Sequence, residues 1–245
     1  MQWTWFRIGA AVTALSGVVA GFVVNVDRAA REGQSLGAVM ANYFSLFTIV
    51  STLLSVAALT AAAAWAARHP GTSREPLSIA LGLAIVSGPI FLLGIVYNAL
   101  LRGLPSAVAL GDSAGIALLD QYAAEVLHVV MPLYFLLDLL FAPRRRGLPW
   151  WSLGVLVSYP VIWITYTMIR GELVANPDAS TAWWYPYPFL DPHGPGGYGT
   201  ALTYIGAILA AFIVIGVGII LIGRYRERRA AVRAVATATA GRLAH

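Results

Sequence analysis

The sequence predicts an all-α integral membrane protein, a bundle of six transmembrane helices. Of its 245 residues, 59% are hydrophobic and only 11% are charged, whereas a soluble domain carries about 25% charged residues. Six apolar runs reach the length of about 20 residues that a membrane-crossing helix needs. None of them alternates polar and apolar side chains as a transmembrane strand does. Together these observations place the chain in a lipid bilayer.

One transmembrane domain, residues 1–223, accounts for most of the chain, and a basic tail of residues 224–245 follows it. The first apolar run is long for a signal peptide and no convincing small-residue cleavage site follows it, so we expect it to be retained as a span. The six predicted spans cover residues 5–24, 43–67, 77–100, 117–141, 149–169 and 200–222.

Arginine is distributed unevenly between the two sides of these spans. The two termini and the second and fourth connections hold 12 of the 16 basic residues. The other connections hold Arg28, Arg31, Arg102 and Arg170. Because cytoplasmic connections carry the excess of basic residues in membrane proteins, the sequence predicts a multi-pass protein with both termini in the cytoplasm.

Two residue types are absent from the chain. Without cysteine there is no disulfide or thiolate metal site. Without lysine there is no Schiff base with retinal or pyridoxal phosphate and no Walker A phosphate loop.

The net charge of +5 includes a basic tail that can lie against anionic lipid headgroups. We therefore expect membrane lipids as partners, and no nucleic acid.

Polar side chains inside the spans are costly and are often functional. At a rise of about 1.5 Å per residue, Thr48 lies roughly 9 Å and His128 roughly 12 Å below the outer ends of their helices. At matched depth in the outer leaflet, they form a candidate pair of nucleophile and base. Other polar residues expected near this level are Ser51, Asn98, Arg102, Glu125, Tyr166 and Arg170.

Each of these residues also has a simpler interpretation. A lone buried histidine is often a hydrogen-bonded structural residue, and a threonine hydroxyl usually bonds to the carbonyl four residues earlier. Glu125 and His128 have the Glu-x-x-His spacing of di-metal bundles, but the second motif that such sites need is missing. Glu125 would instead orient His128 or face the headgroups. Asp138, six residues before Arg144, is expected to form a local ion pair with it.

Residues 111–115 read GDSAG, which matches the G-x-S-x-G pattern of a hydrolase nucleophile elbow. That pattern is informative at a strand-to-helix turn, whereas here it precedes a predicted membrane helix. We therefore expect Asp112 or Ser113 to cap the helix.

The connection before the last span contains WWYPYPFLDP, residues 183–192. An aromatic belt at the headgroups explains part of it, but the Tyr-Pro-Tyr-Pro run also predicts a stiff extended strip. We expect a lid over the polar outer-leaflet site, with Asp191 capping the last helix or pairing with Arg102 or Arg170. The lid residues are Trp184, Tyr185, Pro186, Tyr187, Pro188, Phe189 and Asp191.

Five stretches carry a family resemblance by their order: FSLFTIVSTLL (44–54), HVVMPLYFLLDLLF from His128, the short basic connection, YPVIWITYTMIRG (159–171) and YPYPFLDP (185–192). With these, the chain resembles the bacterial six-helix Pr-six-Pr membrane proteins, relatives of the androgen-induced membrane proteins of animals. The animal relatives are threonine hydrolases of fatty acid esters of hydroxy fatty acids. The resemblance places their threonine at Thr48 and their histidine at His128. It departs at Ser51, where the relatives have an acidic residue, and at Pro132, which lies one position early.

The resulting hypothesis is an intramembrane lipid-ester hydrolase of the bacterial cytoplasmic (inner or plasma) membrane. Thr48 would attack the ester carbonyl, and His128 would accept the hydroxyl proton and return it to the leaving alcohol. Asn98 or Arg102 would stabilise the oxyanion or hold a lipid carboxylate. Substrate would enter sideways from the outer leaflet, and the mechanism requires no metal or organic cofactor. The alternative is a non-enzymatic protein that binds a lipid or small molecule, or a carrier.

Overall fold

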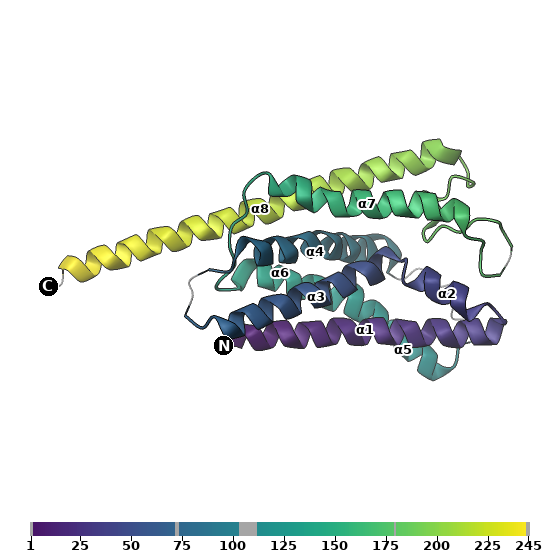
Figure 1. The fold of residues 1–245 in the computed structure, drawn as a ribbon, viewed down its shortest axis with the longest axis horizontal. Helices are drawn as coiled ribbons and strands as arrows, with labels where there is room; N and C mark the ends of the chain where they lie inside the picture. Colours follow the sequence, from purple (N-terminus) through teal and green to yellow (C-terminus); the bar gives the residue numbers. More distant parts are fainter. Residues whose placement is uncertain (1, 72–73, 103–111, 179, 244–245) are drawn as a thin grey trace.

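The structure, a computed structural model, describes residues 2–71, 74–102, 112–178 and 180–243. Six helical segments are long and apolar enough to cross a membrane, in agreement with the predicted multi-pass helical protein. The helices lie side by side along the long axis of the molecule, and both termini lie toward the same end (Figure 1). No strand occurs in the described part of the chain.

The helices of the described chain differ in length. The long ones are α1 (Gln2–Glu32), α3 (Phe47–Arg68), α4 (Leu77–Val96), α7 (Ser152–Leu173) and α8 (Gly197–Leu243). The fourth span is built from three segments, α5 (Ala114–Glu125), η2 (Val126–Val130) and α6 (Met131–Phe141). The short elements are α2 (Leu36–Tyr43), the π-helical turn η1 (Tyr97–Leu101) and the 3₁₀ turn η3 (Pro188–Leu190).

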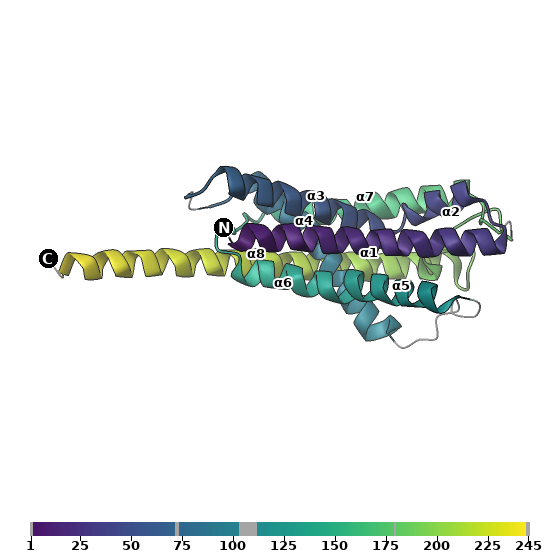
Figure 2. The same cartoon turned by 90° about the horizontal axis from the view of Figure 1, so that it is seen from below.

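Two features of the helices differ from the sequence-based expectation. Helix α2 precedes the second span and begins where the Ser35 hydroxyl accepts a hydrogen bond from the backbone N–H of Ala38. The basic tail continues α8 as a helix that projects beyond the bundle (Figure 2). Alanine and arginine, which dominate this tail, both favour the helical state.

The predicted cap of the fourth span is confirmed, since the Ser113 hydroxyl accepts a hydrogen bond from the backbone N–H of Ile116.

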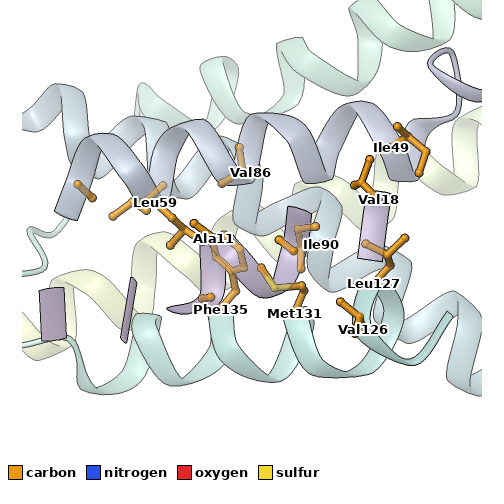
Figure 3. Packing of buried hydrophobic residues seen from close by; sticks show 14 of the residues in the cluster. Ala11, Val18, Ile49, Leu59, Val86, Ile90, Val126, Leu127, Met131 and Phe135 are labelled. Carbon is orange, nitrogen blue, oxygen red and sulfur yellow. The ribbon is translucent and has the colours of Figure 1, made fainter. Parts of the chain in front are cut away.

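The main core lies where α1 packs against α3 and the fourth span. Its buried side chains include Val18, Leu59, Ile90, Met131 and Phe135 (Figure 3). Helix α1 presents small residues to its neighbours, and a Cβ at Gly17 would lie 2.7 Å from Val126 Cγ1. Small residues let membrane helices approach closely and gain van der Waals contact.

The end of the bundle at which the chain begins, which we call the terminal end, contains a closed ionic network. Arg7 donates from Nε to Asp138 at 3.0 Å and from Nη2 to Glu75 at 3.3 Å. Trp3 and Arg145 also donate to Asp138. All four charged side chains are at most 4% exposed.

The expected pairing of Asp138 with Arg144 is wrong. Arg144 instead donates to the backbone carbonyl of His69 at 2.9 Å and lies over the ring of Trp65. Asp138 is fully buried, so it needs the deeper partners Arg7 and Arg145. The local partner is Arg145, the residue next to Arg144, and Arg7 could not be identified from neighbouring residues because it belongs to the N-terminal span.

Candidate functional site

The predicted site residues lie in two groups toward the opposite end of the bundle. Thr48 and Ser51 on α3 belong with α7 and the lid residues. His128 in η2 belongs with Asn98, Arg102 and Glu125. We refer to these as the lid-side group and the His128 group.

Thr48 occupies the first turn of α3, whose N-terminus has no side-chain cap because Leu46 stands at the capping position. The hydroxyl of Tyr187 faces this helix end, with the Thr48 hydroxyl and the backbone at Phe47 and Thr48 as its hydrogen-bonding neighbours. Burial raises the pKa of the Tyr187 phenol, and these neighbours only partly oppose the rise. Tyr187 therefore stays protonated at neutral pH and cannot act as a base toward Thr48.

The other lid-side hydroxyls are paired across the interface between α3 and α7. Ser51 shares a hydrogen bond of 2.8 Å with the Tyr159 hydroxyl. Ser45 shares one of 3.1 Å with Tyr166, and the Ser45 hydroxyl also bonds to the carbonyl of Ala41. These contacts hold α7 against the start of α3, so Ser51 and Tyr166 act first as structural partners.

Arg170 joins this interface to the lid. Its guanidinium donates to the Asn42 side chain at 2.7 Å and lies 5.2 Å from the centre of the Trp184 ring. Trp184 and Pro186 line a small hollow with Arg170. The segment that contains Trp184 and Pro186 is thus fixed to the C-terminal ends of α2 and α7.

The aromatic lid packs onto the helix ends. The backbone N–H of Trp184 donates to the carbonyl of Gly171 at 3.0 Å, and the Tyr185 hydroxyl donates to Glu172 at 2.7 Å. Tyr187 is extended, and the chain then turns at Pro188. Phe189 packs against Tyr187 and Tyr204.

Asp191 does not have the partners expected for it. Its carboxylate accepts from the backbone N–H of His193 at 2.9 Å, which closes a local turn. It pairs with neither Arg102 nor Arg170 and does not cap α8, which begins at Gly197. The short aspartate side chain readily accepts a hydrogen bond from the backbone N–H two residues further along the chain, which stabilises a turn.

Around His128 the backbone departs from α-helical geometry. Pro132 lacks an N–H, so the carbonyl of His128, four residues earlier, loses its usual helical partner. The Asn98 amide donates to this carbonyl at 3.0 Å and to the carbonyl of Gly94 at 2.8 Å. Both His128 and Asn98 lie in π-helical turns, η2 and η1. Such turns are rare and occur frequently at functional sites.

Of the two nitrogens of the His128 ring, only Nδ1 has a hydrogen-bond partner within the described part of the chain. It stacks on Tyr97 with ring centres 4.6 Å apart, and Nδ1 lies 3.0 Å from the carbonyl oxygen of Ala124. A carbonyl only accepts, so in the neutral ring Nδ1 carries the proton and Nε2 is left as an acceptor. That tautomer suits a general base or a ligand-binding acceptor.

Glu125 pairs with Arg102, and among the described residues no hydrogen bond joins it to the His128 ring. Arg102 also donates to the side-chain oxygen of Asn98 at 3.1 Å, so one chain of contacts runs from Glu125 to the His128 carbonyl. Among the described residues, no group of three or more acidic or histidine side chains could hold a metal ion.

A groove of about 630 Å³ opens beside the His128 group, which is within the usual range for a ligand site. It runs between α4, α6 and α8, and Leu133 and Leu136 on its rim are 55% and 40% exposed. Apart from Asn98 and His128, its lining is apolar or small: Phe91, Gly94, Ile95, Val129, Pro132, Leu133, Leu136, Leu139, Ile215, Gly218, Ile219 and Ile222.

The structure does not bring Thr48 and His128 into contact. Thr48 faces Tyr187 under the lid, whereas His128 lies against Tyr97 and lines the groove. Proton transfer between them would need a bridging water or a rearrangement. The catalytic assignment stays a prediction.

Some residues of the site were outside the sequence-based selection. Tyr97 and the groove-lining residues of α8 gave no polar signal, although Pro132 was visible as a break in the fourth span.

Searches found no matching family model, curated protein or solved structure for the chain.

Proposed function

We propose that the protein binds a membrane lipid in the groove between α4, α6 and α8, with a polar group of the lipid at His128. The observation that carries this proposal is an apolar groove that ends at two polar side chains in π-helical turns. From His128 to Leu139 the groove follows α6 for roughly 16 Å, comparable to one leaflet of a hydrocarbon core about 30 Å thick.

The exposed rim supports sideways entry from the bilayer. The Asn98 amide nitrogen is occupied by two carbonyls and its oxygen by Arg102. His128 Nε2 is then the available acceptor, which favours a lipid with a hydroxyl or another donor at that level. Arg102, 47% exposed in its side chain, can also attract an acidic group.

A substitution at Gly218 offers a way to block the groove. A Cβ added at Gly218 would meet nothing within 4 Å, and the same holds for Gly206, which lies elsewhere on α8 and outside the groove lining. We expect Gly218→Leu to abolish retention of a bound lipid in protein purified in neutral detergent, measured by mass spectrometry of extracted lipids. Gly206→Leu is the matched control. Equal retention in both variants would contradict the proposal.

Hydrolysis of a bound lipid ester is the second candidate. It is favoured by the position of Thr48, whose hydroxyl lies at an uncapped helix N-terminus where backbone N–H groups can stabilise an oxyanion. The resemblance to the threonine hydrolases supports the same residue. This activity requires Tyr187 to move and a base to approach Thr48.

Hydrolysis is tested with medium- and long-chain esters on folded, detergent-solubilised protein. Thr48→Ala and His128→Ala should each abolish turnover, and labelling by a fluorophosphonate probe should disappear in Thr48→Ala. Thr165→Ala, which removes an exposed hydroxyl of α7, is the control. Full turnover in either Thr48→Ala or His128→Ala would exclude the pair, whereas lipid retention without any turnover would leave the binding function alone.

The arginine distribution supports an orientation with both termini in the cytoplasm of a bacterial cell, within its cytoplasmic membrane. In that orientation the lid and the His128 group lie toward the outer leaflet. A cysteine introduced at Ser180 should then react with a membrane-impermeant thiol reagent in whole cells, and one at Arg68 should not. The chain has no cysteine of its own to interfere.

A further inference from the structure

A second large cavity lies at the terminal end, between the end of α6, the connection that follows it and α8. Its volume is about 720 Å³. One side is apolar, formed by Leu140, Phe141 and Ile222. We call this cavity the arginine hollow, after its charged lining residues: Arg74, Arg145, Arg226, Glu227, Arg229 and Arg233.

The positive charges of the hollow exceed its negative charges. Its single carboxylate, Glu227, pairs with Arg74. Arg226 donates to two neutral partners, the backbone carbonyls of Leu139 at 2.5 Å and Ala142 at 2.7 Å.

Arg229 adds a further charge at the open side of the hollow. It lies over the ring of Tyr225 at 4.9 Å, and no carboxylate of the described residues pairs with Arg226 or Arg229. These guanidiniums are held in place by contacts that leave their charge uncompensated. An anion entering the hollow would therefore find fixed donors.

The apolar side of the hollow is accessible from outside the bundle. Phe141 is 60% exposed and Tyr225 is 55% exposed. Ile222 lines both this hollow and the groove beside His128, so an apolar seam continues from the arginines toward the middle of the membrane. A ligand can thus place an anionic group among guanidiniums and an acyl chain on Phe141 and Ile222.

We propose that the arginine hollow binds the headgroup of an anionic phospholipid. Guanidiniums recognise phosphate through paired, charge-assisted hydrogen bonds. Basic pockets between membrane helices on the cytoplasmic side bind such headgroups, and the cytoplasmic leaflet supplies anionic lipids. The arginine distribution predicts that this face is cytoplasmic. The site does not depend on what the groove beside His128 binds, since its charged residues belong to a different end of the bundle.

The test compares two pairs of arginines in the full-length chain. Arg229→Gln with Arg233→Gln changes the hollow. Arg68→Gln with Arg228→Gln removes the same charge from residues that do not line it. All proteins are held in a neutral detergent, titrated with phosphatidylglycerol or with phosphatidylcholine of the same chains, and the lipids bound per chain are counted by native mass spectrometry.

We expect the unchanged protein to retain one phosphatidylglycerol and to prefer it to phosphatidylcholine. The pair of substitutions in the hollow should weaken this retention about fivefold for each arginine removed, and the control pair should leave it unchanged. Equal retention of the two lipids, or an equal loss in the control pair, would show that only diffuse surface charge is involved and would overturn the proposal. Displacement of the lipid by inorganic phosphate at a similar concentration would also overturn it, because the site would then need no acyl chain.

Discussion

Two polar clusters at opposite ends of the bundle differ in how far their charged groups are buried and paired. At the terminal end, Arg7, Glu75, Asp138 and Arg145 form one buried network in which charges compensate each other. At the opposite end, the Arg102–Glu125 pair is 47% and 35% exposed, and His128 keeps a free ring nitrogen beside an open groove. The first arrangement holds helices together. The second leaves polar groups available to a ligand, at a lower contribution to stability.

The largest effect is expected from Asp138→Asn. This change leaves Arg7 and Arg145 without their shared carboxylate in a fully buried site. Breaking a buried ion pair from one side costs about 3–5 kcal/mol. Thermal unfolding in detergent measures the loss, and Glu125→Gln, in the exposed pair, should cost at most about 1 kcal/mol. Equal losses of stability in Asp138→Asn and Glu125→Gln would contradict the difference between the buried and the exposed ion pairs.

Replacing Glu75 should stabilise the fold at neutral pH, whereas replacing Asp138 should destabilise it, although both carboxylates contact Arg7. Burial raises the pKa of Glu75 above its ordinary value, with Arg7 and Arg145 opposing the rise, and its Oε1 atom is buried without a hydrogen-bond partner. The pKa of Glu75 is therefore higher in the folded than in the unfolded state. The contribution of this group to the free energy of unfolding is fully present at a pH below its unfolded-state pKa. It is lost as the pH rises through the folded-state pKa.

Glu75→Gln should therefore match the unchanged protein at acidic pH and become the more stable of the two at neutral pH. The gain is about 1.4 kcal/mol for each unit by which the pKa is raised. Melting temperatures measured from acidic to neutral pH test this, with the exposed Glu32→Gln as control. A difference that does not change with pH would contradict the assigned cause.

At the opposite end, Tyr187→Phe should have a moderate effect. The change removes the hydroxyl that faces the uncapped N-terminus of α3, and leaves the backbone at Phe47 and Thr48 without that hydrogen-bonding neighbour. We expect a loss of about 1–2 kcal/mol and faster reaction of Thr48 with an ester-reactive probe. Tyr198→Phe, at an exposed position of α8, should change neither quantity. Unaltered probe reaction in Tyr187→Phe would show that the lid does not limit access to Thr48.

The smallest change in stability is expected for Arg102→Gln. Exposed ion pairs contribute about 0–1 kcal/mol, so unfolding should be nearly unaffected, as for the exposed Arg68→Gln. Retention of a lipid with an acidic group should nevertheless fall in Arg102→Gln and not in Arg68→Gln. Equal retention would remove Arg102 from the ligand site.

Hydrophobic runs were sufficient to predict the six spans, because membrane insertion depends on composition over about 20 residues. The cap at Ser113 was also predictable, since it depends only on neighbours along the chain. The pairing of Asp138 with Arg7 was not, because it depends on how α1 packs against the fourth span. Contact between Thr48 and His128 could not be predicted either. Their similar depths follow from the helical rise per residue, but the directions of their side chains depend on helix rotation and on the turn η2.

The groove beside His128 is tested most directly by photo-crosslinking with a fatty acid that carries a diazirine along its chain. Peptide mass spectrometry then locates the adducts in the purified protein. Binding in the groove predicts adducts concentrated on Leu133, Leu136 and Ile215, and their loss in Gly218→Leu. Val12 and Val214 are at least as exposed as the rim of the groove but do not line it, so they should react little. Adducts spread evenly over all these positions would contradict a lipid site beside His128.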